Sequence, residues 1–150
     1  MPDVTEKPTL LEIKNSSKVL EYLSDIEDIS FKNIREDIFE VSNLDTGLTC
    51  IVDVEESIVC LQMDVCVVPS DNRERYPLIE NLLRKNADAV HGKFCAAKEK
   101  ILYKDNLEIE NLDKNELEAS LSWMFAMVHN SIEEIASIVD AGEREEKSND

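Results

Sequence analysis

Apolar side chains recur every three or four residues in three segments of the chain, a spacing that places them on one face of a helix. The first segment covers residues 10–23, and Thr9 with Glu12 gives it the capping-box pattern of a helix start. The second follows Pro77, and the third opens with another such pattern at residues 113–116. The stripe of the second helix is Ile79, Leu82, Leu83 and Val90, and that of the third is Leu117, Leu121, Met124, Phe125, Val128, Ile132, Ile135 and Val139.

Alternation of apolar and polar residues predicts β-strands between these helices. One strand covers residues 38–44 and ends at the turn signal of residues 45–47. Residues 47–68 predict two strands folded back on each other as a hairpin, and residues 91–112 predict two more. Residues 30–37 have no clear period, so they fit either a loop or a frayed first strand.

The central hairpin is predicted to turn at residues 55–56, which sets its register and divides its side chains between two faces. One of these faces is mixed, and on it Ile51, Ile58 and Cys60 form a small apolar island. Cys66 extends the island unless a bulge reverses part of the strand. The pairs predicted on the continuously apolar face are Leu48 with Met63, Cys50 with Leu61 and Val52 with Val59.

The predicted order is helix, three strands, helix, two strands and helix. Such a segregated order indicates an α+β sandwich, in which one five-stranded, mainly antiparallel sheet carries its helices on one face. We expect a single domain at residues 9–140, a flexible leader at residues 1–8 and a charged flexible tail at residues 141–150. The uncovered face of the central hairpin must then meet water, a second subunit or a partner.

The charge of the chain excludes one class of partner. It carries 33 acidic and 16 basic residues, a formal net charge of −17, and would repel the phosphates of nucleic acids. No apolar run approaches the ~18 residues of a membrane span. Residues 1–14 lack the pattern of a signal peptide, so we expect a cytoplasmic protein with reduced thiols.

No pattern in the sequence predicts catalysis, a metal or a cofactor. The four cysteines, Cys50, Cys60, Cys66 and Cys95, form no C-x-x-C pair and have no histidine at the spacing of a zinc site. We interpret Cys50 and Cys95 as small core residues. The acidic segment 105–118 lacks the glycine of a calcium loop. The sequence therefore predicts a protein that is not an enzyme.

The segment "LLRKNADAVHGKF" at residues 82–94, together with the order of elements, resembles the YbjN-like proteins, which share the fold of the type III secretion chaperones. The resemblance covers about residues 10–139. It implies a small, acidic, cytoplasmic homodimer that binds an extended segment of a client protein across its sheet and helix surface without ATP. The residues that carry it most clearly are Leu82, Leu83, Asn86, Gly92 and Phe94.

We therefore interpret the chain as a non-enzymatic protein-binding module, chaperone-like or regulatory, that holds a partner segment. The acidic surface leads us to expect basic segments among its partners. Trp123 either packs at the edge of the sheet or adds to the interface. A small-molecule-sensing domain with a pocket between sheet and helices is the alternative. The candidate partner or dimer surface is Ile51, Ile58, Cys60, Cys66 and Trp123.

Overall fold

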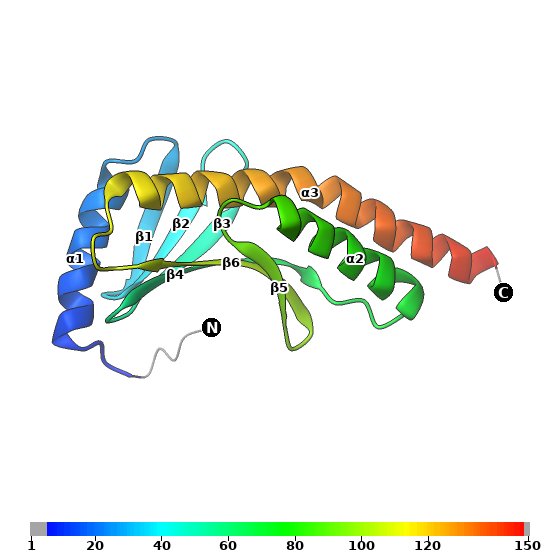
Figure 1. Cartoon of the computed structure of the whole chain (residues 1–150), viewed down its shortest axis with the longest axis horizontal. Helices are drawn as coiled ribbons and strands as arrows, with labels where there is room; N and C mark the ends of the chain where they lie inside the picture. The colour runs from blue at the N-terminus through cyan, green and yellow to red at the C-terminus, as the bar shows by residue number, and fades with distance from the viewer. Residues whose placement is uncertain (1–5, 149–150) are drawn as a thin grey trace.

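The computed structural model describes the backbone of residues 6–148 and the side chains of residues 6–140 (Figure 1). Its helices are separated by runs of antiparallel strands, four after the first helix and two after the second. In chain order they are α1 (Leu10–Ser24), β1 (Ile29–Arg35), β2 (Ile38–Asn43), β3 (Thr49–Val54), β4 (Ile58–Val67), α2 (Asn72–Asp88), β5 (Lys93–Ala97), β6 (Lys100–Glu108) and α3 (Lys114–Ser148).

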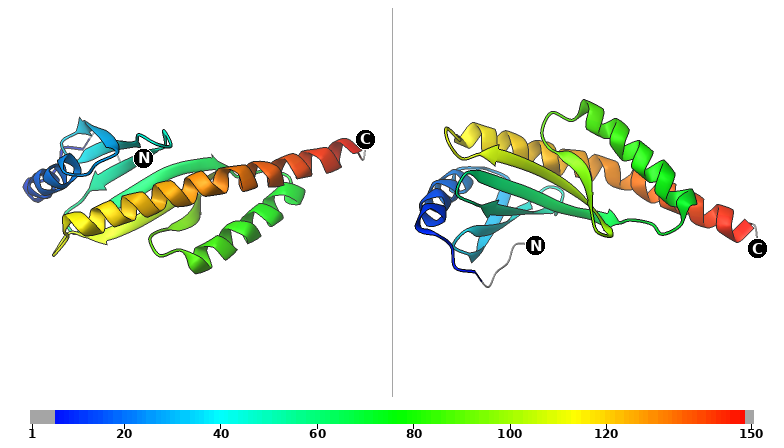
Figure 2. Two further views of the ribbon diagram at one scale, coloured as in Figure 1. Left: turned by 90° about the horizontal axis from the view of Figure 1, so that it is seen from above. Right: turned by 60° about the horizontal axis from the view of Figure 1, so that its bottom comes forward.

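The strands form one sheet in the order β1-β2-β3-β4-β6-β5, and every neighbouring pair is antiparallel. Helix α3 runs along this sheet. Helix α1 lies beside the first half of α3, and α2 lies beside its second half (Figures 1 and 2). One continuous core joins α1, α2 and α3 to a single face of the sheet. We call the other face, on which none of the described helices packs, the helix-free face. The predicted α+β class with helices on one face is confirmed.

The sheet has six strands, where the sequence predicted five. The extra strand is β1, which lies within the segment that fitted a loop or a frayed strand. Three successive residues in it, Lys32, Asn33 and Ile34, are exposed, and its pairing with β2 shifts register near its end. An edge strand that is exposed in this way lacks the alternation by which a half-buried strand is found.

The register of the central hairpin is shifted by two residues from the predicted one. Val52 lies opposite Leu61 rather than opposite Val59. The turn is formed by residues 56–57, because the amide of Glu55 donates to the carbonyl of Ile58 at 2.9 Å. A shift of two residues leaves every side chain on its predicted face, so the apolar face is buried as expected.

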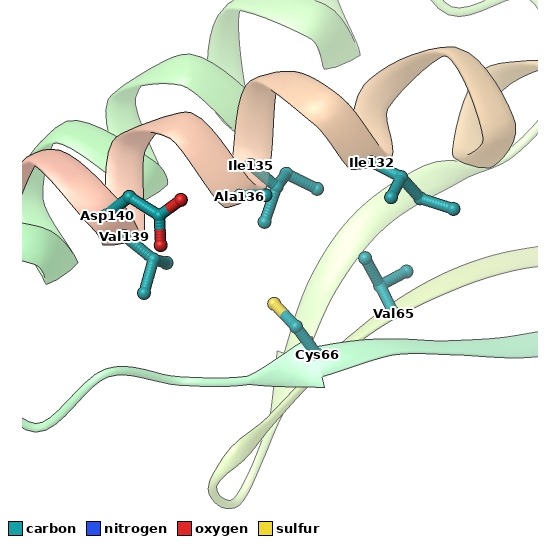
Figure 3. Close-up of a pocket in the computed structure, with 7 residues that line it drawn as sticks. All are labelled: Val65, Cys66, Ile132, Ile135, Ala136, Val139 and Asp140. Carbon is teal, nitrogen blue, oxygen red and sulfur yellow. The ribbon is translucent and has the colours of Figure 1, made fainter.

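A β-bulge between Asp64 and Cys66 reverses the alternation at the end of β4. Cys66 was predicted on the helix-free face, and that prediction is wrong. Its side chain points towards α3, as does that of Val65 (Figure 3). Val67 is exposed instead, although its predicted place was on the core side.

The buried stripe of α2 also differs from the predicted one. Leu78 and Leu82 are buried against the rest of the core, whereas Leu83 is 63% exposed. Val90 lies beyond the end of α2 and is 71% exposed. The helix is capped by Asp71, whose carboxylate accepts from the amide of Arg73 at 2.8 Å. Because α2 is apolar on two sides, its hydrophobic spacing alone does not identify the side that faces the core.

Helix α3 extends to Ser148 and therefore includes most of the segment predicted as a flexible tail. Residues 1–5 of the predicted leader lie outside the described part of the chain. The proposed boundaries of the domain stay predictions.

Gly92 gives a first test of this packing. Its φ is +74°, and a Cβ at this position would lie 2.6 Å from Cε1 of Tyr103 and 2.7 Å from the carbonyl oxygen of Lys104. We expect Gly92→Ala to lower the free energy of unfolding by about 2–4 kcal/mol, measured by denaturant unfolding.

Gly47→Ala is the matched control. Gly47 also has a positive φ, of +75°, but no atom lies within 4 Å of the added Cβ. Its cost should be only about 1–2 kcal/mol. Equal losses for the two variants would contradict the close packing of Tyr103 on Gly92.

Candidate protein-binding surfaces

The two edges of the sheet differ in how they are protected. At the β5 edge, Asn86 of α2 takes the place of a neighbouring strand. Its amide nitrogen donates to the carbonyl of Phe94 at 2.9 Å, and its amide oxygen accepts from the amide of Phe94 at 2.7 Å. Lys93 in turn donates to two carbonyls at the end of α2. These contacts occupy part of an edge that another strand would otherwise pair with.

At the β1 edge no further strand is paired in the described part of the chain. A groove of about 430 Å³ runs between this strand, the start of β2 and α1. Apolar side chains nearby are unusually exposed, including Leu10 at 86% and Leu11, Leu20 and Ile34 at 40–46%. We call this feature the α1–β1 groove; its lining residues are Ile13, Ser16, Ser17, Leu20, Asn33, Arg35, Glu36 and Phe39.

One end of the α1–β1 groove is held by an ion pair. Arg35 donates through its Nε and Nη2 to the two carboxylate oxygens of Asp37, and the latter distance is 2.8 Å. The guanidinium lowers the pKa of the buried Asp37 carboxyl, despite the opposing effect of burial. A two-pronged pair of this kind fixes the β1–β2 turn, so the wall of the groove is rigid at this end.

The helix-free face carries three of the five predicted site residues. Ile51, Ile58 and Cys60 are half-buried there, on the neighbouring strands β3 and β4. Asp53 lies on the same face, directly opposite Cys60. The apolar island of the sequence prediction therefore surrounds a carboxylate.

Asp53 is in an unfavourable environment for a charged group. Its pKa is raised to about 6, first by burial and then by the carboxylate of Glu55. Asp37 and Glu12 act in the same direction, whereas Arg35 opposes them. Among the described residues, Arg35 is the cation that acts on Asp53, and it does not offset the burial and the neighbouring carboxylates.

Cys66 and Trp123 lie on the other side of the sheet, away from the helix-free face. Trp123 packs against the core, and its indole N–H donates to the hydroxyl of Tyr103 at 3.2 Å. Its ring meets that of His91 edge-on, with centroids 6.4 Å apart. Trp123 was expected either to pack at the edge of the sheet or to add to an interface, and these contacts are those of packing. The five predicted residues therefore do not form one surface.

A hollow of about 330 Å³ separates the end of β4 from the later turns of α3 (Figure 3). Val65 and Cys66 form its floor, and its other lining residues come from α3. It is the feature closest to the pocket between sheet and helices that the alternative interpretation requires. Its α3 lining residues are Ile132, Ile135, Ala136, Val139 and Asp140.

The sequence interpretation missed two surfaces. One is the α1–β1 groove, which left no signal in the sequence because its walls come from separate elements. The other lies on the outer side of α2, where Tyr76 and Leu83 are 65% and 63% exposed and Ile79 is partly exposed. We call these three residues the α2 stripe. Tyr76 and Leu83 are seven residues apart, which places them on the same side of a helix. This spacing was the sign of the α2 stripe in the sequence.

Nothing in the described residues indicates a metal centre or a membrane span. No group of three or more potential ligands from histidine, cysteine, aspartate and glutamate comes together among the side chains of residues 6–140. None of the described helices is long and apolar enough to cross a membrane.

A family model assigns the chain to a class of proteins. The CesT_Tir_1 model matches residues 12–139, which include all the described strands and most of the described helices. The chain therefore belongs to the CesT_Tir_1 family, a type III secretion chaperone family. This is a chaperone-type, non-enzymatic family. The resemblance inferred from the sequence is confirmed.

Solved structures share the fold at low sequence identity. An uncharacterized protein from Methanothermobacter thermautotrophicus has a TM-score of 0.58 at 12% identity, over 82% of this chain and 97% of that one. YbjN from E. coli has a TM-score of 0.58 at 16% identity, over 81% and 90%. The Yersinia pestis type III secretion chaperone SycH, in complex with a fragment of YscM2, has 0.52 at 16%, over 76% and 96%. No curated protein matches the chain.

The edge contact of Asn86 can be tested directly. We expect Asn86→Ala to lower the free energy of unfolding by about 1–3 kcal/mol, because the amide and carbonyl of Phe94 lose their partner. Hydrogen exchange at the Phe94 amide should become faster. Asn130→Ala, at an exposed position of α3, is the control and should show neither effect.

The cysteines give a test of the two faces. Cys50 is fully buried, which raises the pKa of its thiol to about 12, whereas Cys60, Cys66 and Cys95 are half-buried. Cys95 lies opposite Leu102 on the helix-free side rather than in the core, so the interpretation of it as a core residue is wrong. Maleimide labelling at pH 8 should modify Cys50 only on unfolding. Rapid labelling of Cys50 in the native protein would contradict the assigned core face.

Proposed function

We propose that the chain is a cytoplasmic, non-enzymatic, chaperone-like module that holds an extended segment of a partner protein in the α1–β1 groove. The observation that carries this proposal is the position of that groove beside the open edge of β1. An added strand can pair its backbone with such an edge, while the groove receives alternate side chains of the same segment. The edge would supply affinity and the groove selectivity.

The chemistry of the groove supports an apolar segment with basic flanks. Leu20 lines the groove and is 40% exposed in the single chain, and burying an apolar surface is worth about 25 cal/mol per Å². Glu36 lines the groove, and the net charge of −17 would attract basic residues on either side of the bound segment. The acidic surface would also keep the complex soluble.

We propose further that the protein is a homodimer, as the resemblance implied, and that the helix-free face takes part in the contact. Ile51, Ile58 and Cys60 supply apolar area there that the single chain leaves half-exposed. Family membership supports a protein-binding role, and SycH is a chaperone solved with a bound fragment of YscM2. The four free cysteines suit a reducing compartment such as the cytoplasm.

The small-molecule alternative has weaker support. The hollow between β4 and α3 is lined almost entirely by apolar side chains. Among the side chains that the structure describes, its one charged or hydrogen-bonding lining residue is Asp140, which is exposed. Pockets that recognise small molecules combine apolar walls with a few convergent polar groups.

Peptide binding tests the α1–β1 groove. A library of labelled 15-residue peptides with alternating apolar residues should contain binders, detected by fluorescence anisotropy. Leu20→Asp should weaken a selected binder at least about tenfold, since it places a charge against the apolar segment. Bound peptide should also slow hydrogen exchange in β1.

Leu83→Asp is the matched control, because Leu83 is an exposed leucine on α2 and outside the groove. It should bind the peptide as the wild type does. A second control is a peptide with proline at alternate positions, which cannot donate to the edge of β1. Equal binding of this peptide, or equal effects of the two leucine variants, would refute the proposed mode.

A further inference from the structure

The outer edge of the sheet passes from β5 to β6 partway along β6. Strand β5 pairs only with residues 100–104 of β6, whereas β4 pairs with β6 over its whole length. Beyond that point β6 continues towards the start of α3, and no strand of the described chain lies on its outer side (Figure 1). We call residues 105–108 the free edge of β6. It lies on the opposite side of the sheet from the β1 edge.

The free edge exists because the chain that leads into β5 comes from another direction. A Cβ on Gly92 would lie 2.7 Å from the carbonyl oxygen of Lys104, so the backbone passes close against β6 at this point. One residue earlier, the carbonyl of His91 accepts from the hydroxyl of Tyr103 at 2.6 Å, and Tyr103 is buried on the helix side of the sheet. The segment before β5 therefore does not extend along the free edge.

Two residues of the free edge direct their backbone groups outward. The amide of Ile109 donates to the carbonyl of Ser57, on the β4 side, at 3.0 Å. Because backbone groups alternate along a strand, the odd-numbered residues of β6 bond to β4, and Asn106 and Glu108 point their N–H and C=O groups away from it. Among the described residues, no hydrogen bond outside the sheet involves the backbone of either residue. The free edge thus presents two donors and two acceptors to an added strand.

The surroundings of the free edge are acidic. Residues 105–118, which run from the free edge into α3, contain six acidic residues and one basic residue, a formal charge of −5. Asp105 accepts a hydrogen bond from the hydroxyl of Ser120 at 2.6 Å. Neither Asp105 nor the exposed Glu108 forms an ion pair with another described residue. The one base, Lys114, lies 4.0 Å from an acidic residue of its own helix.

These charges select the kind of strand that the free edge can accept. Charged side chains at an edge resist pairing with strands of the same sign, so acidic segments are disfavoured there. A lysine or arginine directly opposite Glu108 is favoured. Lys93 and Lys104 face each other just beyond the other end of the free edge, so the residue opposite Asn106 should be neutral. Leu107 is half-buried on the helix side and can contact an apolar residue between the two.

We propose that the free edge of β6 binds an extended basic segment of a partner protein, added as an antiparallel strand in line with β5. The backbone of the segment pairs with Asn106 and Glu108, as in other complexes in which a peptide extends a sheet. Its basic residue lies against Glu108, and the charge of the segment offsets that of residues 105–118. This site is separate from the α1–β1 groove and does not depend on it.

Hydrogen exchange of the free protein tests whether the edge is open. The amides of Asn106 and Glu108 should exchange at least about tenfold faster than those of Asp105 and Leu107, which donate to β4. Equal protection of all four amides would show that a second copy or another part of the chain already covers the edge. That result would overturn the inference.

A labelled peptide, KVKVKVT, tests the occupant by fluorescence anisotropy. It should bind and should protect the amides of Asn106 and Glu108. In the antiparallel pairing its lysine amides point to β6 and its valine amides point away. N-methylation of the lysine amides should therefore weaken binding at least about tenfold, whereas N-methylation of the valine amides should change it less than about threefold. Both modified peptides keep their charge, so equal losses would mean electrostatic attraction alone and would exclude strand addition.

Charge reversal tests the chemistry of the site. Glu108→Lys should weaken binding of KVKVKVT about fivefold or more at low salt, because it replaces an attraction by a repulsion. Glu133→Lys is the matched control, since it makes the same change of charge at an exposed position of α3, roughly 20 Å beyond Ser120 along the helix. It should bind within about twofold of the wild type. Equal effects of the two variants would contradict the site.

The two proposed sites can fail separately. If KVKVKVT protects β1 rather than Asn106 and Glu108, the basic segment belongs to the α1–β1 groove. The inference about β6 is then wrong, and the proposed function stands. If instead no peptide binds the α1–β1 groove while KVKVKVT protects the free edge, the proposed function fails and the inference about β6 stands.

Discussion

The rest of the structure depends on the burial of a single face of the sheet. On β3 and β4 one set of alternate side chains, such as Val52 and Leu61, is completely buried under the helices. The stripe of α3 supplies the other half of that contact, with Leu121 and Met124 equally buried. Because the period of a strand is two, the same pairing that buries this face sends every second side chain to the opposite side. The helix-free face is thus a direct result of how the core is formed.

This constraint also explains which parts of the fold could be predicted from the sequence. The stripe of α3 and the two faces of the central hairpin come from long, regular patterns, and a register error of two residues left both faces unchanged. Three features of the fold were not predicted, each for a local reason. Strand β1 is too exposed to alternate, α2 is apolar on two sides, and one inserted residue before Cys66 reverses the end of β4. Hydrophobic periodicity predicts an element correctly when one side, and only one, of that element is buried along its whole length. Each of these three elements departs from that condition.

The candidate surfaces were harder to predict than the fold. The island of Ile51, Ile58 and Cys60 followed from strand parity alone. The raised pKa of Asp53 did not, since it depends first on how far the fold buries this carboxyl and then on the carboxylates of Glu55, Asp37 and Glu12 around it. The α1–β1 groove likewise exists only when a helix and an edge strand are placed side by side. Surfaces built from several elements leave no signal in any one of them.

The two proposed contacts can be occupied at the same time. The α1–β1 groove lies at the outer edge of the sheet, whereas Ile51, Ile58 and Cys60 lie on β3 and β4 of the helix-free face. Neighbouring strands are about 4.8 Å apart, so roughly 14 Å of sheet separates β1 from β4. Arg35 connects the two regions, because it lines the groove and also acts on the pKa of Asp53. A partner segment that drew Arg35 away from Asp37 would therefore change the charges around Asp53 without touching it.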